Sequence, residues 1–379
     1  MGLFADALPG FPWDSLTPHA QRARSHPDGI VDLSVGTPVD PSPPAVRAAL
    51  EAASDSPGYP PTPGTPQLRQ AVVDWFARRR GVSALTERGV LPTVGSKELV
   101  ALLPSMLGLG PGDVVVHPCA AYPTYDIGAR LAGARPVPSD DPAAVLDADD
   151  AVRMVWLNSP SNPTGQVLDV PALAAVVAAA RRAQARHGHR VVVASDECYA
   201  ELAWESPWVD EGVPSLLDPR VAGDDLTGLL AVYSLSKQSN LAGYRAAFTA
   251  GDERVVAGLT GLRKHAGFMV PGPVQAAMLA ALADDEHVVS QRARYARRRN
   301  ALRRAFEDAG YVVDESSAGL YLWVRPTGAQ DSWTTVADLA ALGILVAPGA
   351  FYGDDVHVRV ALTASDERVA HAVARLAGA

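Results

Sequence analysis

Short apolar runs alternate with longer amphipathic segments through the middle of the chain. The runs are rich in Val, Leu and Ala, as are strands that are buried on both faces of a sheet. They lie at residues 89–94, 113–117, 152–157, 190–195 and 229–233. The segments at 67–80 and 171–187 have apolar positions at helical spacing. Because strands and helices alternate, the pattern predicts an α/β fold with a mostly parallel sheet.

The two ends of the chain carry a further set of predicted elements. These are strands at 30–35, 320–324 and 356–362, helices at 44–53 and 333–342, and one long helix over 273–309. The long helix contains five arginines, at positions 292, 294, 297, 298 and 299. Because the chain is acidic overall, we expect these arginines to form a solvated or salt-bridged helix face.

Composition excludes several classes of protein. The 379 residues have a net charge of −9, which disfavours nucleic-acid binding, since that depends on cationic contacts to phosphates. Cys119 and Cys198 provide neither a disulfide framework nor the spacing of a zinc site. No run approaches the ~20 apolar residues of a membrane-spanning helix. We therefore expect a cytoplasmic protein without metal, nucleic-acid or membrane partners.

The strongest candidate for chemistry is Lys237, which follows the predicted strand 229–233. Ser234 and Ser236 lie just before it and Arg245 lies eight residues after it. A lysine amine can form a Schiff base with a cofactor aldehyde, and hydroxyls and an arginine can hold a phosphate. Taken alone, the segment is a weak signal, because most lysines are solvated surface residues. The acyl-serine motif that also begins S-x-x-K is excluded, because its S-D-N and K-T-G companions are absent.

Other polar residues follow the carboxyl ends of separate predicted strands. Asn162 lies in a Pro-rich loop after 152–157, and Asp196 directly follows 190–195. Ser96 begins a helix whose N-terminus is a natural phosphate site. The pattern also fits a capping box with Ser96 as N-cap, and both interpretations can hold at once. Because strand ends of an open parallel sheet share one edge, we expect these residues to meet Lys237 in one crevice.

Four further residues have two interpretations each. Tyr59, on a rigid Pro-rich loop, either packs or delivers a hydroxyl to a ligand or partner subunit. Tyr122, just past a strand end, either joins the core or stacks on a planar cofactor. The loop at Gly36 is either a plain turn or a close approach to a ligand. Arg359 lies in an apolar strand and needs a carboxylate from the protein or from a substrate.

The order and spacing of these motifs resemble the class I/II aminotransferases, fold-type I enzymes that use pyridoxal 5′-phosphate. The resemblance is carried by Asn162-Pro-Thr-Gly, Asp196-Glu-Cys-Tyr199, Ser234-Leu-Ser-Lys237 with Arg245, and Arg359. It implies a seven-stranded, mostly parallel sheet between helices in a large domain over 47–274. It also implies a small α+β domain built from 1–46 and 275–379.

The resemblance implies a role for each candidate residue. Lys237 holds the cofactor and moves a proton, Asp196 pairs with the ring nitrogen, and Tyr122 stacks on the ring. Asn162 and Tyr199 bind the ring hydroxyl, and Gly36, Asn162 and Arg359 bind the substrate, with Arg359 on its α-carboxylate. The phosphate is held by Ser96, Lys97, Ser234, Ser236 and Arg245. Tyr59 reaches the phosphate of the neighbouring subunit, which implies a homodimer with shared sites.

Longer stretches resemble the actinobacterial type of succinyldiaminopimelate aminotransferase, among them Leu8–Asp14, Asp32–Asp40 and Arg263–Ala277. This resemblance implies transfer of an amino group between glutamate and N-succinyl-2-amino-6-oxopimelate in lysine and diaminopimelate synthesis. The segment Gly267-Phe-Met-Val lacks the second arginine of aspartate-specific enzymes and so favours a longer substrate. The alternatives are an aspartate, aromatic or LL-diaminopimelate aminotransferase, or a C–S lyase with the same cofactor.

Overall fold

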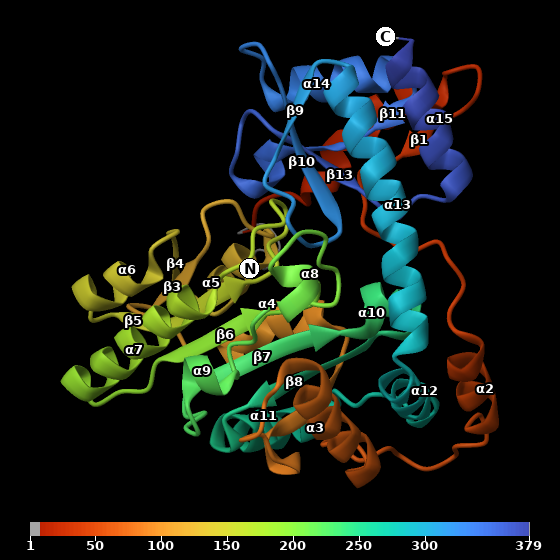
Figure 1. The fold of residues 1–379 in the computed structure, drawn as a ribbon. Coiled ribbons are helices and arrows are strands. Elements are labelled where there is room, and N and C mark those ends of the chain that lie inside the picture. Colours follow the sequence, from red (N-terminus) through yellow and green to blue (C-terminus); the bar gives the residue numbers. More distant parts are fainter. Residues whose placement is uncertain (1–7, 379) are drawn as a thin grey trace, which may run out of the picture.

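The computed structural model describes residues 8–378, and its largest element is a seven-stranded sheet (Figure 1). The strands are β2 (Val90–Val94), β3 (Val114–His117), β4 (Arg135–Pro138), β5 (Val152–Asn158), β6 (Val192–Asp196), β7 (Leu229–Ser234) and β8 (Ala246–Gly251). Their order is β2-β8-β7-β6-β5-β3-β4. All pairings are parallel except those of β8 with β7 and β2. The prediction of a mostly parallel α/β sheet is confirmed.

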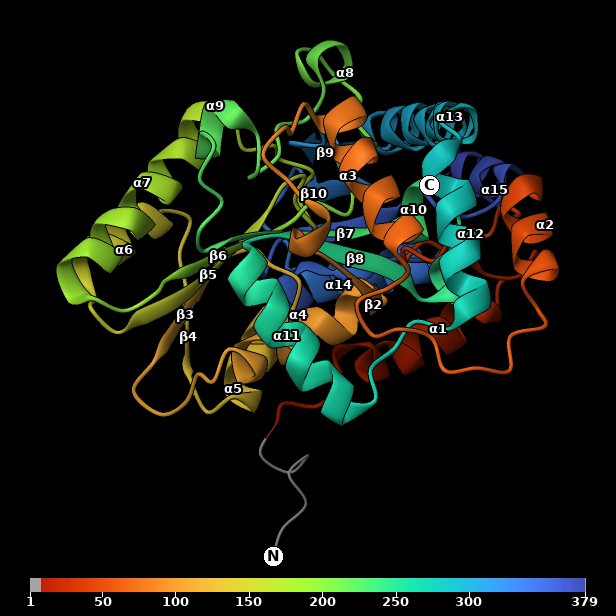
Figure 2. The ribbon, with the colours of Figure 1, turned by 90° about the horizontal axis from the view of Figure 1, so that it is seen from below.

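Helices cover both faces of this sheet (Figures 1 and 2). One face packs against α3 (Pro66–Arg80), α7 (Val170–His187) and α12 (Gly272–Ala283). The other packs against α4 (Ser96–Met106), α5 (Thr124–Leu131) and α11 (Glu253–Ala266). Successive side chains of a strand point to opposite faces, so Val155 joins the first core and its neighbour Trp156 joins the second. This is why the central strands are apolar throughout.

Shorter helices connect these elements. They are α2 (Pro44–Ala52), α6 (Pro142–Ala148), α8 (Trp208–Glu211), α9 (Pro219–Ala222), α10 (Leu235–Gln238) and the 3-10 turns η2 (Pro12–Leu16), η3 (Glu87–Gly89), η4 (Ala242–Tyr244) and η5 (Gly349–Tyr352). The most consequential is α10, because it begins directly after β7 and carries Lys237. No described helix has the length and apolar character needed to cross a membrane.

A second core brings the N- and C-terminal segments together, the red and blue parts of Figure 1. A four-stranded antiparallel sheet has the order β12-β13-β10-β9, and β1 pairs in parallel with β11. The strands are β1 (Val31–Asp32), β9 (Tyr311–Asp314), β10 (Tyr321–Pro326), β11 (Ile344–Leu345), β12 (Ala347–Pro348) and β13 (Val358–Ala361). The helices are α1 (Thr17–Arg24), α13 (Glu286–Asp308), α14 (Ser332–Ala341) and α15 (Asp366–Ala377). The domain limits 1–46 with 275–379 and 47–274 stay a prediction, and residues 1–7 lie outside the described part.

The prediction of one helix over 273–309 is wrong, because the structure has two helices there. α12 ends at Ala283, and Asp284 has an extended backbone (φ −115°, ψ 105°). The Asp284 carboxylate accepts the backbone N–H of Glu286 at 2.9 Å and that of His287 at 3.4 Å. An aspartate that caps new N–H groups starts a helix instead of continuing one.

Three of the five arginines, Arg294, Arg298 and Arg299, are salt-bridged, as one of the two expectations for them stated. Arg298 donates to Asp366 at 2.6 Å and to Asp40 at 2.8 Å, and Arg299 donates to Glu205 at 2.6 Å. Both guanidinium groups are buried, so the expectation of a solvated face is wrong for these two. They tie α13 to loops of distant sequence because a buried charge requires a partner.

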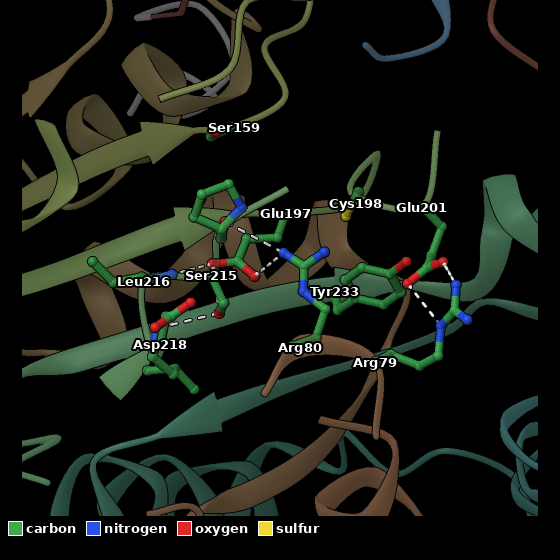
Figure 3. Close-up of polar contacts among 12 residues, drawn as sticks. Arg79, Arg80, Ser159, Glu197, Cys198, Glu201, Ser215, Leu216, Asp218 and Tyr233 are labelled. Atoms are coloured by element: carbon green, nitrogen blue, oxygen red, sulfur yellow. Dashed lines mark hydrogen bonds and ion pairs between the residues drawn. The ribbon is translucent and has the colours of Figure 1, made fainter. Parts of the chain in front are cut away.

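A buried polar cluster lies beneath the end of β6 (Figure 3). Glu197 accepts the backbone N–H of Leu216 at 2.7 Å and the hydroxyl of Ser215 at 3.0 Å, and it faces Arg80 at 3.3 Å. Burial raises the pKa of Glu197, and the positive charge of Arg80 opposes this shift. The cluster therefore fixes the backbone next to Asp196. Removal of one member would leave a buried polar or charged group without its partner.

We expect Arg80→Leu to lower the free energy of unfolding by about 3–5 kcal/mol, since it leaves a buried carboxylate without its counter-charge. The matched control is Arg78→Leu on the same helix, where a surface pair with Asp285 is lost at a cost of about 0–1 kcal/mol. Urea denaturation followed by circular dichroism measures both. Equal effects of the two substitutions would contradict the role given to Arg80.

Candidate active site

The carboxyl ends of β5, β6 and β7 open into a cavity of about 470 Å³. It contains twelve of the thirteen residues that the sequence singled out: Gly36, Ser96, Lys97, Tyr122, Asn162, Asp196, Tyr199, Ser234, Ser236, Lys237, Arg245 and Arg359. The thirteenth, Tyr59, is 94% exposed and lines none of the cavities described for this chain. The predicted convergence on one crevice is therefore present.

Lys237 is held at the centre of the cavity by two distant segments. The turn from β7 into α10 projects its side chain, and Nζ donates a hydrogen bond to the carbonyl oxygen of Gly36. Gly36 must be glycine, because an added Cβ would overlap the hydroxyl of Tyr321. Desolvation in the cavity lowers the pKa of Lys237. The amine therefore loses its proton more easily than an ordinary lysine, as a nucleophile or proton carrier requires.

Asp196 is a buried carboxyl group that faces the same cavity. It accepts the hydroxyl of Tyr125 at 3.0 Å and the backbone N–H of Cys198 at 3.2 Å. Burial raises its pKa, and these hydrogen bonds and the charge of Lys237 act in the opposite direction. A carboxylate in such a position gains most from a cationic partner, such as a protonated ring nitrogen.

Arg359 is 3% exposed and lies among aromatic rings and neutral acceptors. It donates to the side-chain oxygen of Asn162 at 2.9 Å and to the carbonyl oxygen of Ser34 at 2.7 Å. Its Cζ lies 3.9 Å from the ring centroid of Tyr321. Within the described chain no carboxylate lies at ion-pair distance from Arg359, and its Nε has no partner. A buried guanidinium without a carboxylate is ready to bind the carboxylate of a ligand.

Hydroxyl, guanidinium and backbone N–H groups gather at another wall of the cavity. Ser234 donates its hydroxyl to that of Ser236 at 2.8 Å, and Arg245 lies beside the start of α4. An added Cβ at Gly95 (φ 76°) would overlap the guanidinium of Arg245, so glycine is required for this approach. A helix N-terminus with hydroxyls and an arginine suits a phosphate.

The expectation that Ser96 is the N-cap of this helix is wrong. The N-cap is Gly95, and the carboxylate of Glu98 instead reaches back to the backbone N–H of Val94 at 3.0 Å. Ser96 is the first helical residue, and its side chain lines the cavity. Its hydroxyl is thus available to a ligand.

Among the lining residues that sequence reasoning missed, three form side-chain hydrogen bonds with predicted site residues. Asn158 accepts the backbone N–H of Asn162 at 2.7 Å and donates to the carbonyl oxygen of Asp196 at 2.9 Å. Tyr125 donates its hydroxyl to Asp196. The hydroxyl oxygens of Tyr321 and Tyr199 lie 3.3 Å apart. Sequence position could have pointed to two of the three residues. Asn158 is the last residue of a strand, and Tyr125 lies three residues after Tyr122, in the first turn of α5.

Comparison with known proteins agrees with this geometry. The family model described as aminotransferase class I and II matches residues 28–376. The chain is 54% identical to 4-dedimethylamino-4-oxo-anhydrotetracycline transaminase OxyQ of Streptomyces rimosus, over 97% of this chain and 99% of that protein. It is 56% identical to a Mycobacterium tuberculosis protein named probable aminotransferase Rv1178, over 98% of this chain and 85% of that protein.

Solved structures give the same result. N-succinyldiaminopimelate aminotransferase from Mycobacterium tuberculosis superposes with a TM-score of 0.86 at 25% identity, over 100% of this chain and 99% of that chain. The fold is that of the fold-type I enzymes. The chain belongs to the class I and II aminotransferases.

The cofactor of this family, and hence of this chain, is pyridoxal 5′-phosphate. The cavity fits it on three points of its own chemistry. A lysine amine with a lowered pKa suits the aldehyde, a buried carboxyl group suits the ring nitrogen, and the Ser96, Ser234, Ser236 and Arg245 wall suits the phosphate. The individual roles of these residues stay a prediction.

We expect Tyr125→Phe to lower kcat about tenfold, because Asp196 loses a hydrogen bond worth about 1.4 kcal/mol. Loss of this donor also raises the pKa of Asp196 further, so the acidic limb of the kcat–pH profile moves to higher pH. Steady-state rates between pH 5 and 9 measure both effects. Tyr311→Phe, in β9 outside the cavity, is the control. An unchanged acidic limb in Tyr125→Phe would contradict the coupling to Asp196.

Proposed function

We propose that the chain is a pyridoxal-phosphate-dependent transaminase that exchanges amino groups between glutamate and a larger second substrate. The observation that carries the proposal is one cavity with a lysine amine of lowered pKa, a buried carboxyl group and an arginine without a carboxylate. When bound, the cofactor supplies an aldehyde that condenses with amines and a ring that accepts electrons.

The residues of this chain divide the remaining work. Arg359 grips the α-carboxylate of the substrate and so orients Cα toward the amine of Lys237. Lys237 Nζ would move a proton between Cα of the substrate and the aldehyde carbon of the cofactor, which its lowered pKa favours. Asp196 holds the ring nitrogen in its protonated form. Tyr122 and Tyr199 position the ring, as the resemblance to the family implies.

Lys97 is the residue that we assign to the distal carboxylate of glutamate. Its Nζ lies 5.3 Å from the ring centroid of Phe11 and 5.8 Å from that of Tyr122, at the mouth of the cavity. An ammonium flanked by two aromatic rings is directed toward the ligand without being neutralised. Lys264, the remaining lysine of the chain, does not line this cavity.

Two second substrates have support. N-succinyl-2-amino-6-oxopimelate is favoured by the resemblance of long sequence stretches and by the full-length structural match. A ketone on a large fused-ring body, as the name of the Streptomyces rimosus relative describes, is favoured by 54% identity over nearly both whole chains. The two differ in charge beyond the reacting carbonyl, since the first carries further carboxylates there and the second does not.

We also propose a homodimer with shared sites. Tyr59 is 94% exposed on a loop that is rigid with proline, which suits a hydroxyl offered to a partner subunit. Sedimentation equilibrium is expected to give about twice 39.7 kDa. A fully active monomer would exclude this arrangement.

The function is tested by single half-reactions on the purified, cofactor-loaded protein. We expect glutamate to convert the cofactor from its aldehyde to its amine form, with aspartate and phenylalanine at least about tenfold slower. The amine form then reacts with N-succinyl-2-amino-6-oxopimelate or with the ring ketone. Absorbance spectroscopy follows each step. A C–S lyase is tested separately with cystathionine: release of a thiol and ammonia from it without the amine form would assign the chain to the lyases instead.

We expect Lys97→Met to raise the KM for glutamate about tenfold, the effect of losing about 1.4 kcal/mol of a charge-assisted contact. The KM for alanine, which has no distal carboxylate, stays unchanged. Lys264→Met is the matched control and is expected to behave as the wild type. An equal rise in KM for both amino acids would show that Lys97 acts on the cofactor phosphate, as the sequence suggested.

A further inference from the structure

A second cavity of about 540 Å³, here called the side cavity, adjoins the active site. The two cavities share Phe11, Trp13, Lys97 and Tyr122 as lining residues. Tyr122 therefore lies at the boundary between the active site and the side cavity. The volume lies in the range of small-molecule sites and equals many times the space of one water molecule. Glutamate held between Arg359 and Lys97 leaves this space unused.

The chemistry of the side cavity is that of an apolar binding site. Its walls come from the segment at 8–13, from α4 and α5 and from η5, and they include Leu8, Ala101, Ile127, Pro138 and Phe351. Such walls gain free energy by burying an apolar group, roughly 25 cal/mol per Å² removed from water. Apart from Lys97, His117 and Asp126, the lining residues of the described chain provide no charged partner for a charged group.

The charges of the lining residues support this. Within the described chain, Lys97 is the single lysine or arginine that lines the side cavity. Burial lowers the pKa of His117, which disfavours its cationic form, and its Nδ1 is occupied by a contact of 2.8 Å with the carbonyl oxygen of Pro118. Asp126 is engaged by Arg130 at 2.6 Å. A ligand group with two carboxylates would enter without enough counter-charge, which is costly.

We infer that the side cavity is a substrate subsite that receives an uncharged, largely apolar, ring-sized part of the second substrate, beyond Lys97. The inference rests on the proposed transaminase function and names the class of its larger substrate. It favours the ring ketone over the succinylated dicarboxylate. Lys97 then marks the boundary between the two substrates. The distal carboxylate of glutamate binds its ammonium group, whereas the larger substrate extends beyond Lys97 into the side cavity.

Binding is tested through Cys119, which is exposed and lines the side cavity, whereas Cys198, the other cysteine, is buried. Alkylation of the holoenzyme by iodoacetamide is followed by peptide mass spectrometry. We expect 2-oxo-4-(2-naphthyl)butyrate to slow alkylation of Cys119 at least about tenfold, and 2-oxoglutarate to leave it unchanged. Protection by N-succinyl-2-amino-6-oxopimelate but not by the naphthyl acid would overturn the inference, as would no protection by either.

Specificity is tested by filling the cavity with Ile127→Trp on α5. We expect the half-reaction rate with 2-amino-4-(2-naphthyl)butyrate to fall at least about tenfold more than the rate with glutamate. Ser105→Trp, an exposed position on α4 that lines neither cavity, is the matched control and is expected to lower neither rate. Equal losses for both substrates in Ile127→Trp would overturn the subsite.

The two tests separate this inference from the proposed function. Protection of Cys119 reports binding even if no amino group is transferred. Absence of the glutamate half-reaction together with protection by the naphthyl acid would reject the transaminase and keep the cavity as a binding site. Turnover of glutamate without protection or selectivity would keep the transaminase and reject the subsite.

Discussion

The parallel pairing of β5, β6 and β7 is the constraint on which the site depends. Its register places Asn158 directly beside Asp196, and the strand after β6 delivers Ser234 and then Lys237 at the same edge. Backbone hydrogen bonds set this register, and a slip of one residue would turn every side chain to the opposite face. The two apolar cores on either side of the sheet make such a slip too costly in free energy. Core packing therefore fixes the positions of the site residues.

Burial then gives each charged group in the cavity its reactivity. Desolvation lowers the pKa of Lys237 and raises that of Asp196, and it leaves Arg359 dependent on neutral acceptors and aromatic rings. None of these groups is in its most stable environment without a ligand. The surrounding structure, including the Arg80–Glu197 cluster beneath β6, holds them in place. Holding desolvated charged groups in place costs folding free energy, as is usual for a preorganised site. The cofactor and the substrate gain binding free energy because they supply the missing partners.

In the proposed function, specificity is decided at a different place from the chemistry. The groups to which it assigns the transfer step lie at the strand ends and at Arg359, whereas Lys97 and Tyr122 lie where the active site meets the side cavity. A charged boundary followed by an apolar space can accept both a short dicarboxylate and a longer, uncharged body. This explains how one site could serve two unlike substrates in alternate half-reactions without a second arginine.

The sequence by itself determined the α/β class, five of the seven strands of the large sheet and twelve residues of the cavity, because buried strands and strand-end polar residues leave a local pattern. It missed two strands of that sheet, β8 and the edge strand β4, whose two prolines hide its periodicity, and it missed the break at Asp284, which depends on a single capping carboxylate. Only the tertiary structure revealed Tyr125 and Tyr321 as neighbours of Asp196 and Tyr199, and it alone revealed the side cavity. Contacts between segments far apart in the chain, such as that between Tyr125 and Asp196, 71 positions apart, leave no trace in local periodicity, since they are fixed by how the two cores pack.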